Sequence, residues 1–164
     1  MIKTSVTILF AQLPIFIIIL LFLTLDTIVN PISYLINISG HISIIFIFIT
    51  LLSSRIILLK EKLDRRVLGL ASFFYLIAHM IFYYIDNNFI LEYMVDDLIS
   101  LSFIQVGYFA FVLYLPLVFS SSSKAKIILG KLWSSIHKLI YLILAISLIH
   151  YYQVIKADFI YMYF

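Results

Sequence analysis

Apolar residues run along this chain in five long stretches that are separated by short charged segments. The uncharged stretches are residues 4–25, 27–54, 67–85, 98–123 and 139–155. A helix of about 20 apolar residues is long enough to cross the hydrocarbon core of a bilayer. Each stretch therefore predicts one transmembrane helix. Together they predict an all-α integral membrane protein built as a bundle of five transmembrane helices.

The limits of two stretches need adjustment. Residues 27–54 exceed the length of one span and contain Asn30-Pro31 and Ser39-Gly40, which are typical of turns. We therefore expect a connecting loop over 26–39 and a helix that starts at Gly40. The last stretch is short, but the uncharged segment before it extends it. The predicted helices span approximately 4–25, 40–59, 67–85, 98–119 and 132–155. No internal repeat is apparent in the sequence.

The composition supports the membrane class. Of the 164 residues, 65% are hydrophobic and 12% are charged, and the mean hydropathy is +1.18. Soluble domains rarely reach these values. We therefore expect a single transmembrane domain over residues 1–164, in contact with membrane lipid and without a nucleic-acid partner. The chain has no cysteine, which excludes disulfides, thiolate metal ligands and iron–sulfur clusters. The first apolar stretch exceeds the usual core of a signal peptide, and no small-x-small cleavage site follows it, so we interpret it as an uncleaved helix.

The charged residues predict the orientation in the membrane. Ten of the eleven positive residues fall on one side of the predicted helices: Lys3, Arg55, Lys60, Lys62, Arg65, Arg66, Lys124, Lys126, Lys131 and Lys138. The opposite side carries Asp26, Asp86, Glu92, Asp96, Asp97 and Asp158. Positive residues are retained on the cytoplasmic side of membrane proteins. The N-terminus is therefore predicted to be cytoplasmic, and the acidic side to face outward.

Histidines inside two of the predicted helices are the main candidate site residues. An imidazole within hydrocarbon is costly and usually marks a functional site. At about 1.5 Å per residue, His79 lies about 20 Å above Arg66, and His150 lies about 18 Å above Lys138. Both predicted helices start on the cytoplasmic side, so the two rings are expected at nearly equal depth. Two imidazoles at one depth suit axial ligation of one haem iron. The alternative is that each histidine only hydrogen-bonds a neighbouring helix.

The other two histidines are less easily assigned. His137 precedes His150 by 13 residues, which at about 100° per residue places it some 140° from the face of His150. Either a π-bulge realigns the helix, or His137 faces a different environment from His150. In its own environment, His137 is either a further cofactor-binding residue at an inner haem or an interfacial residue that faces headgroups or haem propionates. His41 directly follows Gly40, and we interpret it as an interfacial residue at the outer mouth of its helix.

No sequence motif for bond chemistry is present. The chain has no G-x-S-x-G, H-E-x-x-H, P-loop or dinucleotide-binding pattern. No catalytic residue and no site for NAD(P)H are predicted.

Two histidine-containing segments carry a family resemblance. The segment from Arg65-Arg66 through Leu68-Gly69-Leu70 to His79 resembles the R-R-x-L-G-L…H signature of the MsrQ (YedZ) family. A second segment is similar to the L-G-x-x-W-x-x-L-H-x-x-x-Y…H helix of that family, with its matching positions at Leu129, Gly130, Trp133, His137, Tyr141 and His150. The resemblance covers about residues 26–156.

The resemblance implies a function. The family provides the haem-binding membrane subunit of a bacterial protein-methionine-sulfoxide reductase system, within the ferric-reductase-like transmembrane superfamily. The resemblance implies a multi-pass protein of the bacterial inner membrane with haem b as its cofactor. FMN is also associated with the family. Electrons would come from quinone or a cytoplasmic flavin reductase. They would pass to a periplasmic molybdopterin-containing reductase that repairs oxidised methionine.

The sequence also departs from the family pattern. The usual R-P-Y before the fourth helix appears as Leu101-Ser102-Phe103, and the T-P after the second helix appears as Ser53-Ser54. The chain stops where the sixth helix of the family would begin, so that helix is expected to be missing. Two alternative functions stay open: a ferric-chelate reductase-like haem protein, and a haem-free structural membrane protein.

The predicted orientation can be tested with reporter fusions. A reporter fused after Lys62 should be cytoplasmic, and one fused after Asp86 should be periplasmic, because the positive residues lie before the third predicted helix. Paired alkaline phosphatase and fluorescent-protein fusions at both positions measure this. The reverse pattern would reverse the proposed direction of electron flow.

Overall fold

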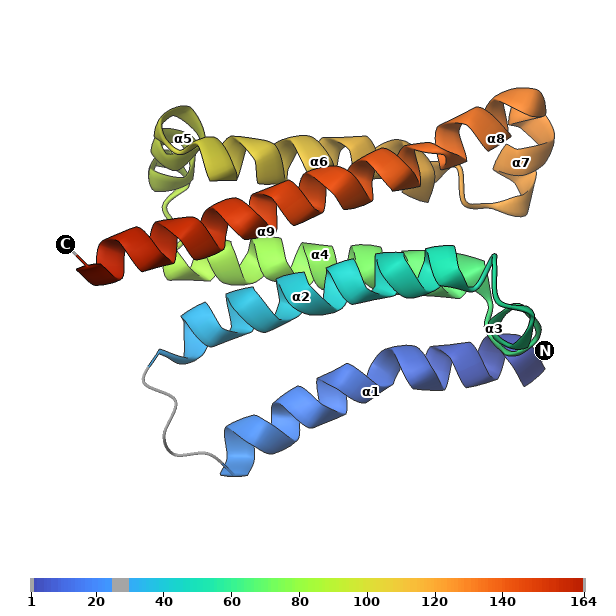
Figure 1. Cartoon of the computed structure of the whole chain (residues 1–164), viewed down its shortest axis with the longest axis horizontal. Helices are drawn as coiled ribbons and strands as arrows, with labels where there is room; N and C mark the ends of the chain where they lie inside the picture. The colour runs from blue at the N-terminus through green and yellow to red at the C-terminus, as the bar shows by residue number, and fades with distance from the viewer. Residues whose placement is uncertain (1, 25–29, 164) are drawn as a thin grey trace. The chain divides into compact units, whose positions relative to one another are not determined.

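Helices account for most of the chain that the structure describes. The computed structural model describes residues 2–24 and 30–163, with side chains over 2–20 and 30–157. Its helices are α1 (Ile2–Thr24), α2 (Pro31–Leu52), α3 (Ile57–Lys62), α4 (Arg65–Asp86), α5 (Leu91–Ser100), α6 (Ser102–Phe119), α7 (Ser123–Leu129), α8 (Lys131–His137) and α9 (Leu139–Tyr163) (Figure 1). Among the described residues, five segments are long and apolar enough to cross a membrane: Ile2–Leu20 of α1, α2, α4, α6 and Lys131–Ala157. The predicted class, all-α with five transmembrane helices, is confirmed.

The helices form two compact units, one ending at Phe89 and the other beginning at Ile90. In the first unit, α2 and α4 pack along each other, and α1 packs on α4 (Figure 1). In the second unit, α6 and α9 pack along each other, with α5 at one end of α6 and with α7 and α8 at the other. Each unit therefore contains one long two-helix hairpin. The single domain expected over residues 1–164 stays a prediction.

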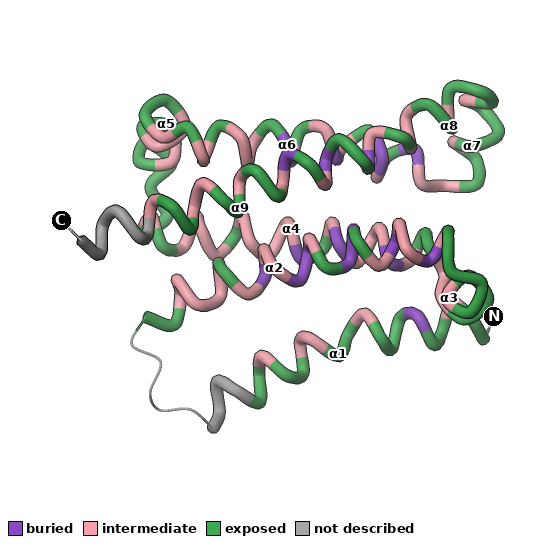
Figure 2. Tube along the Cα trace, in the orientation of Figure 1, coloured by how far each residue is buried: buried purple, intermediate pink, exposed green. Residues whose placement is uncertain are grey.

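The hairpin of the first unit is held by small polar and large aromatic residues. Ser43 and Ser72 are buried where α2 crosses α4, and each hydroxyl lies within 3.0 Å of the other residue's carbonyl oxygen. Phe46 stacks on Tyr75 with ring centroids 5.6 Å apart. The Tyr75 hydroxyl donates to the carbonyl of Ala11 on α1 at 2.8 Å. Figure 2 shows that buried positions gather on the hairpins, whereas most of α1 is exposed.

The two hairpins share one register, which was not evident in the sequence. Each residue of α2 corresponds to the residue of α6 that is 67 positions later in the sequence. Both helices end at equivalent residues, and both have a serine C-cap. The buried pairs are Ser43 and Ala110, Ile47 and Tyr114, Thr50 and Leu117, and Ser53 and Ser120. Residues of α9 follow those of α4 by 71 positions, with the buried pairs Ser72 and Ile143, and Tyr75 and Ile146. The chain thus builds the same hairpin twice.

The predicted start of the second transmembrane helix was wrong. The helix begins at Pro31, not at Gly40, because the Asn30 side chain accepts a hydrogen bond from the Ser33 amide at 3.1 Å. Asparagine before proline is a favourable helix start, since proline has no amide hydrogen to satisfy in the first turn. Gly40 therefore lies well inside α2. Residues 26–29 of the predicted loop lie outside the described residues.

Other predicted boundaries also shift. The helix expected over 40–59 ends at Leu52, where the Ser53 hydroxyl bonds back to the Thr50 carbonyl, and α3 follows as a separate short helix. The helix expected over 98–119 begins at Ser102, because Leu101 has an extended backbone that separates α6 from α5. The helix expected over 132–155 is interrupted at Lys138, between α8 and α9. By contrast, α1 and α4 lie within two residues of expectation where they are described.

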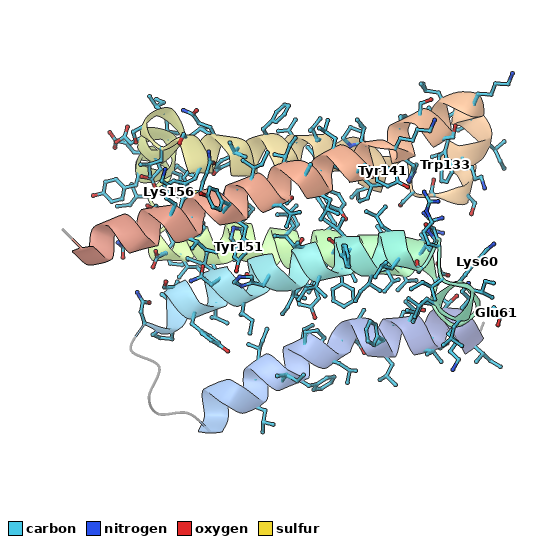
Figure 3. The ribbon with its side chains drawn as sticks, in the orientation of Figure 1. Lys60, Glu61, Trp133, Tyr141, Tyr151 and Lys156 are labelled. Carbon is cyan, nitrogen blue, oxygen red and sulfur yellow. The ribbon has the colours of Figure 1, made fainter. Side chains whose placement is uncertain are left out.

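Polar contacts and labelled side chains locate the basic segments within each unit. In the first unit, the Lys3 ammonium donates to the Lys60 carbonyl, and the Thr4 hydroxyl donates to the Asp64 carboxylate at 3.1 Å. The start of α1 therefore lies beside the basic segment around α3, where Figure 3 shows Lys60 and Glu61. In the second unit, Trp133 and Lys156 lie at opposite ends of the α8–α9 segment (Figure 3). Asp26, assigned to the acidic side, lies outside the described residues.

Candidate functional site

His79 lies on α4, and its ring packs against the backbone of α2. The ring Nδ1 is 2.8 Å from the carbonyl oxygen of Ile36. A Cβ atom at Gly40 would lie 3.1 Å from Nδ1 and 3.3 Å from Cε1 of the same ring. Contacts this close are rare, so the missing side chain of Gly40 makes room for the imidazole. We call the Ile36 carbonyl and Gly40 together the α2 cradle.

His150 on α9 has equivalent surroundings in the second unit. Its Nδ1 is 2.7 Å from the carbonyl oxygen of Phe103 on α6. A Cβ atom at Gly107 would lie 3.0 Å from Cε1, 3.1 Å from Nδ1 and 3.4 Å from Nε2. In both units the carbonyl residue precedes the glycine by four positions, about one helical turn. We call the Phe103 carbonyl and Gly107 together the α6 cradle.

The cradles determine which nitrogen of each ring carries the proton. A carbonyl oxygen only accepts hydrogen bonds, so the Nδ1 atoms of His79 and His150 must donate. In a neutral imidazole the lone pair then lies on Nε2, which is the atom able to ligate a metal. An N–H bond to a backbone carbonyl is also the usual outer-shell partner of a metal-ligating histidine, and it raises the basicity of the ligand. Both rings therefore have the chemistry of axial haem ligands.

His137 lies in a different environment, at the α8 end of the second unit. Its Nε2 is 3.2 Å from the hydroxyl oxygen of Ser120, the C-cap of α6. Its ring lies 4.1 Å from the Trp133 ring, centroid to centroid. The Trp133 indole donates to the Ser120 carbonyl at 2.9 Å, and the Lys126 ammonium lies 4.9 Å from the Trp133 ring centroid. His137 is therefore tied to the end of α6 by its contacts with serine and tryptophan.

The break after His137 excludes the predicted π-bulge. The amide of Lys138 bonds to the Ser135 carbonyl, and the amide of Tyr141 bonds to the Lys138 carbonyl, both at 3.2 Å. These bonds span three residues, as in a 3₁₀ turn, whereas a π-bulge requires bonds that span five. His137 and His150 therefore do not lie on one continuous helix. The other predicted alternative, a separate environment for His137, is the one that the structure shows.

The structure also corrects the position of His41. This residue lies ten positions into α2, about 15 Å along the helix, rather than at its mouth. It follows Gly40 directly, so its side chain leaves the helix about 100° away from the α2 cradle. His41 is half-buried and is not part of the cradle.

His79 and His150 belong to different units, so their predicted pairing is not tested and stays a prediction. Within the described residues, no three histidine, aspartate or glutamate side chains are close enough to hold a bare metal ion. A haem needs only axial ligands from the protein, since the porphyrin supplies the other four nitrogens. The donor set, two imidazoles whose Nδ1 atoms bond to backbone carbonyls, fits such a group.

The two glycines are the functional residues that the sequence analysis missed. Gly40 was interpreted as a helix start, and Gly107 was not assigned a role. The available signal was their position: glycine inside a helix costs about 1 kcal/mol relative to alanine. A glycine within an apolar helix is therefore a candidate for a close approach by a neighbouring group, which the structure shows at Gly40 and Gly107 and not at Gly69.

Comparison with known proteins agrees with this arrangement. A family model described as "Ferric reductase like transmembrane component" matches residues 39–148. The chain belongs to the ferric reductase-like transmembrane family. The matched region contains Gly40, His79, the α6 cradle and His137; it begins three residues after Ile36 and ends two residues before His150. With five candidate spans among the described residues and its membership of this family, the chain is a multi-pass inner-membrane protein.

Three curated relatives of this chain carry the name protein-methionine-sulfoxide reductase heme-binding subunit MsrQ. The chain is 35% identical over 130 residues to the subunit of Herminiimonas arsenicoxydans, covering 75% of this chain and 59% of the relative. It is 35% identical over 129 residues to that of Polaromonas naphthalenivorans (strain CJ2), with the same coverage. It is 34% identical over 94 residues to that of Brucella ovis. The resemblance to MsrQ is confirmed, and the chain spans about three-fifths of the first two relatives. No solved structure matches it.

The protonated nitrogen of each cradle histidine can be measured directly. In the haem-free protein, ¹⁵N NMR of labelled histidine should show His79 and His150 as neutral rings with the proton on Nδ1, because each Nδ1 donates to a carbonyl. Spectra of His79→Ala and His150→Ala assign the signals. A proton on Nε2 of either ring would contradict the cradle geometry.

Proposed function

We propose that this chain is the haem-binding membrane subunit of a protein-methionine-sulfoxide reductase system. The observation that carries the proposal is the pair of equivalent cradles, each of which leaves the Nε2 lone pair of a membrane histidine as the ligating atom. The names of the curated relatives support it. The chain would relay electrons and would perform no bond chemistry itself.

In this proposal His79 and His150 hold one haem iron through their Nε2 atoms. A haem bound there supplies a one-electron carrier that alternates between ferric and ferrous iron. The Ile36 and Phe103 carbonyls would fix the tautomer and the orientation of the two imidazoles and raise their basicity as ligands. Because the chain has no cysteine, the haem cannot be attached through thioethers, which favours haem b.

The direction and partners of electron transfer follow from the predicted topology. Electrons would enter from quinone or a cytoplasmic flavin reductase on the basic side of the membrane. They would leave on the acidic side toward a periplasmic molybdopterin-containing reductase that repairs methionine sulfoxide. FMN is a further candidate cofactor on the donor side. No residue of this chain is assigned to the donor or to FMN.

A second candidate function is a ferric-chelate reductase-like role with the same haem ligands. The description of the matched family model favours it. The two functions differ in the electron acceptor, so reduced protein should distinguish them. Rapid reoxidation by the periplasmic reductase and not by ferric citrate supports the first function. Absence of haem from purified protein would contradict both and favour a structural role.

The ligand pair can be tested by substitution. His79→Ala and His150→Ala should each convert a six-coordinate low-spin haem to a five-coordinate form or lose it, because one axial ligand is removed. The double variant should be no worse than the worse single variant, since the two residues act as a unit. The measurement is the reduced absorbance spectrum at equal protein concentration. His41→Ala is the matched control and should retain the wild-type spectrum. Wild-type low-spin haem in either single variant would disprove the pairing.

His137 requires a separate test. If it ligates a second haem, His137→Ala should lower the haem-to-protein ratio and leave the first haem low-spin. Trp133→Phe is the control, because it removes the indole bond to Ser120 and keeps the imidazole. An unchanged ratio in His137→Ala would assign the histidine to the structural contact with Ser120 alone.

A further inference from the structure

We propose that Gly40 and Gly107 are positioning residues for haem ligation: each holds a histidine ring against the carbonyl one turn earlier, so that Nε2 is presented to the iron. This inference rests on the proposed function. It goes further by assigning two residues of the neighbouring helices, neither of which could touch the iron, to the control of its ligands.

The first argument is the contrast among the helical glycines. Gly40 and Gly107 would each place a Cβ atom 3.0–3.1 Å from the nearest atom of a histidine ring. Gly69, on the same helix as His79, would place its Cβ more than 4 Å from any neighbouring group. Glycine weakens a helix wherever it occurs, but only at two of these three positions does the structure give a steric reason for it.

The second argument is the repeated geometry. The two glycines are 67 positions apart, which is the register shift that relates α2 to α6. Most of the paired side chains in the two hairpins differ, as in Ser72 and Ile143. The histidine, the glycine and the carbonyl one turn before it are nevertheless present in both. The two hairpins therefore share the groups that orient an imidazole, namely the glycine and the carbonyl one turn before it.

The third argument concerns what a methyl group would do. Alanine at either position would push the ring aside by a few tenths of an ångström. That movement lengthens the Nδ1–H bond to Ile36 or Phe103, which are at 2.8 Å and 2.7 Å. A weaker bond makes the imidazole a poorer donor to ferric iron. The reduction potential of the haem should then rise, and its affinity for the protein should fall.

The two positions should not respond equally. A Cβ at Gly107 would lie 3.4 Å from Nε2 itself, whereas the three ring atoms nearest a Cβ at Gly40 are Nδ1, Cε1 and Cγ. The methyl group of Gly107→Ala would therefore press on the ligating nitrogen as well as on the hydrogen-bonded edge. Gly107→Ala should have the larger effect.

The experiment compares Gly40→Ala, Gly107→Ala and the control Gly69→Ala in the full chain purified in detergent. Haem content, the low-spin spectrum and the midpoint potential are measured on each. We expect about tenfold or more weaker haem affinity in the two cradle variants, typical of lost outer-shell partners, and a raised potential in the haem that remains. Gly69→Ala should match the wild type, because its methyl group meets open space.

A second measurement covers the case in which a cradle variant fails to fold. His150→Gly should bind free imidazole in place of the lost ring and regain low-spin haem. 1-Methylimidazole has no N–H group to donate to Phe103, so it should restore the low-spin form at much higher concentration. Equal rescue by the two compounds would disprove the role of the cradle at His150.

The outcomes separate this inference from the proposed function. Both are supported if the wild type binds haem, the two cradle variants have weaker haem affinity and a raised potential, and Gly69→Ala matches the wild type. If the wild type binds haem and the cradle variants have the same haem affinity, spectrum and potential as the wild type, this inference alone is overturned. A wild type without haem overturns the proposed function and this inference together.

Discussion

The structure depends on one interaction, the bond from an imidazole Nδ1–H to a backbone carbonyl of the preceding long helix. In hydrocarbon, an unpaired N–H group is costly, and apolar helices offer few acceptors other than their own carbonyls. A helical carbonyl is already bonded along its helix, so a second donor must approach a remaining lone pair at close range. Gly40 and Gly107 permit that approach. Histidine, glycine and carbonyl are thus one physical unit, which explains why a glycine that weakens its helix is present.

This unit is built twice, and the repetition explains features of both hairpins. α2 and α6 end at equivalent residues, and Ser53 and Ser120 close both helices with their hydroxyls bonded to a carbonyl of the last turn. Between those points the buried side chains differ, because a membrane hairpin needs close packing and not one particular residue. Ser43 and Ala110, for example, are both small and both buried. The sequence therefore hides a repeat that burial and register show clearly.

Much of the fold could be predicted because hydrophobic length is a strong signal in membranes. The five spans followed from it, and so did the location of His79 and His150 inside long apolar helices. The errors arose where local chemistry competes with hydropathy. Asn30-Pro31 was interpreted as a turn although the pair is also a helix start, and this error displaced Gly40 to a helix end. The interruption at Lys138 had no sequence signal, since it comes from three-residue bonds inside an apolar segment. The placement of His79 beside Gly40 depends on how α4 packs against α2, and the hydrophobic pattern along each helix does not predict that packing.

The repeat also bears on the number of haems that the two hairpins can ligate. In the sequence, the offset of 71 positions that relates His79 to His150 also relates Arg66 to His137, which lies on α8 before the break at Lys138. Arginine keeps its proton in proteins and cannot ligate iron. His79 and His150 are therefore equivalent positions that both carry an imidazole, whereas only one residue of the pair Arg66 and His137 can ligate iron. His137 contacts Ser120 and Trp133. A second haem ligated by His137 would need its other axial ligand from a residue that the repeat does not supply. The repeat therefore favours the proposed pairing of His79 and His150 at one iron over a second haem at His137.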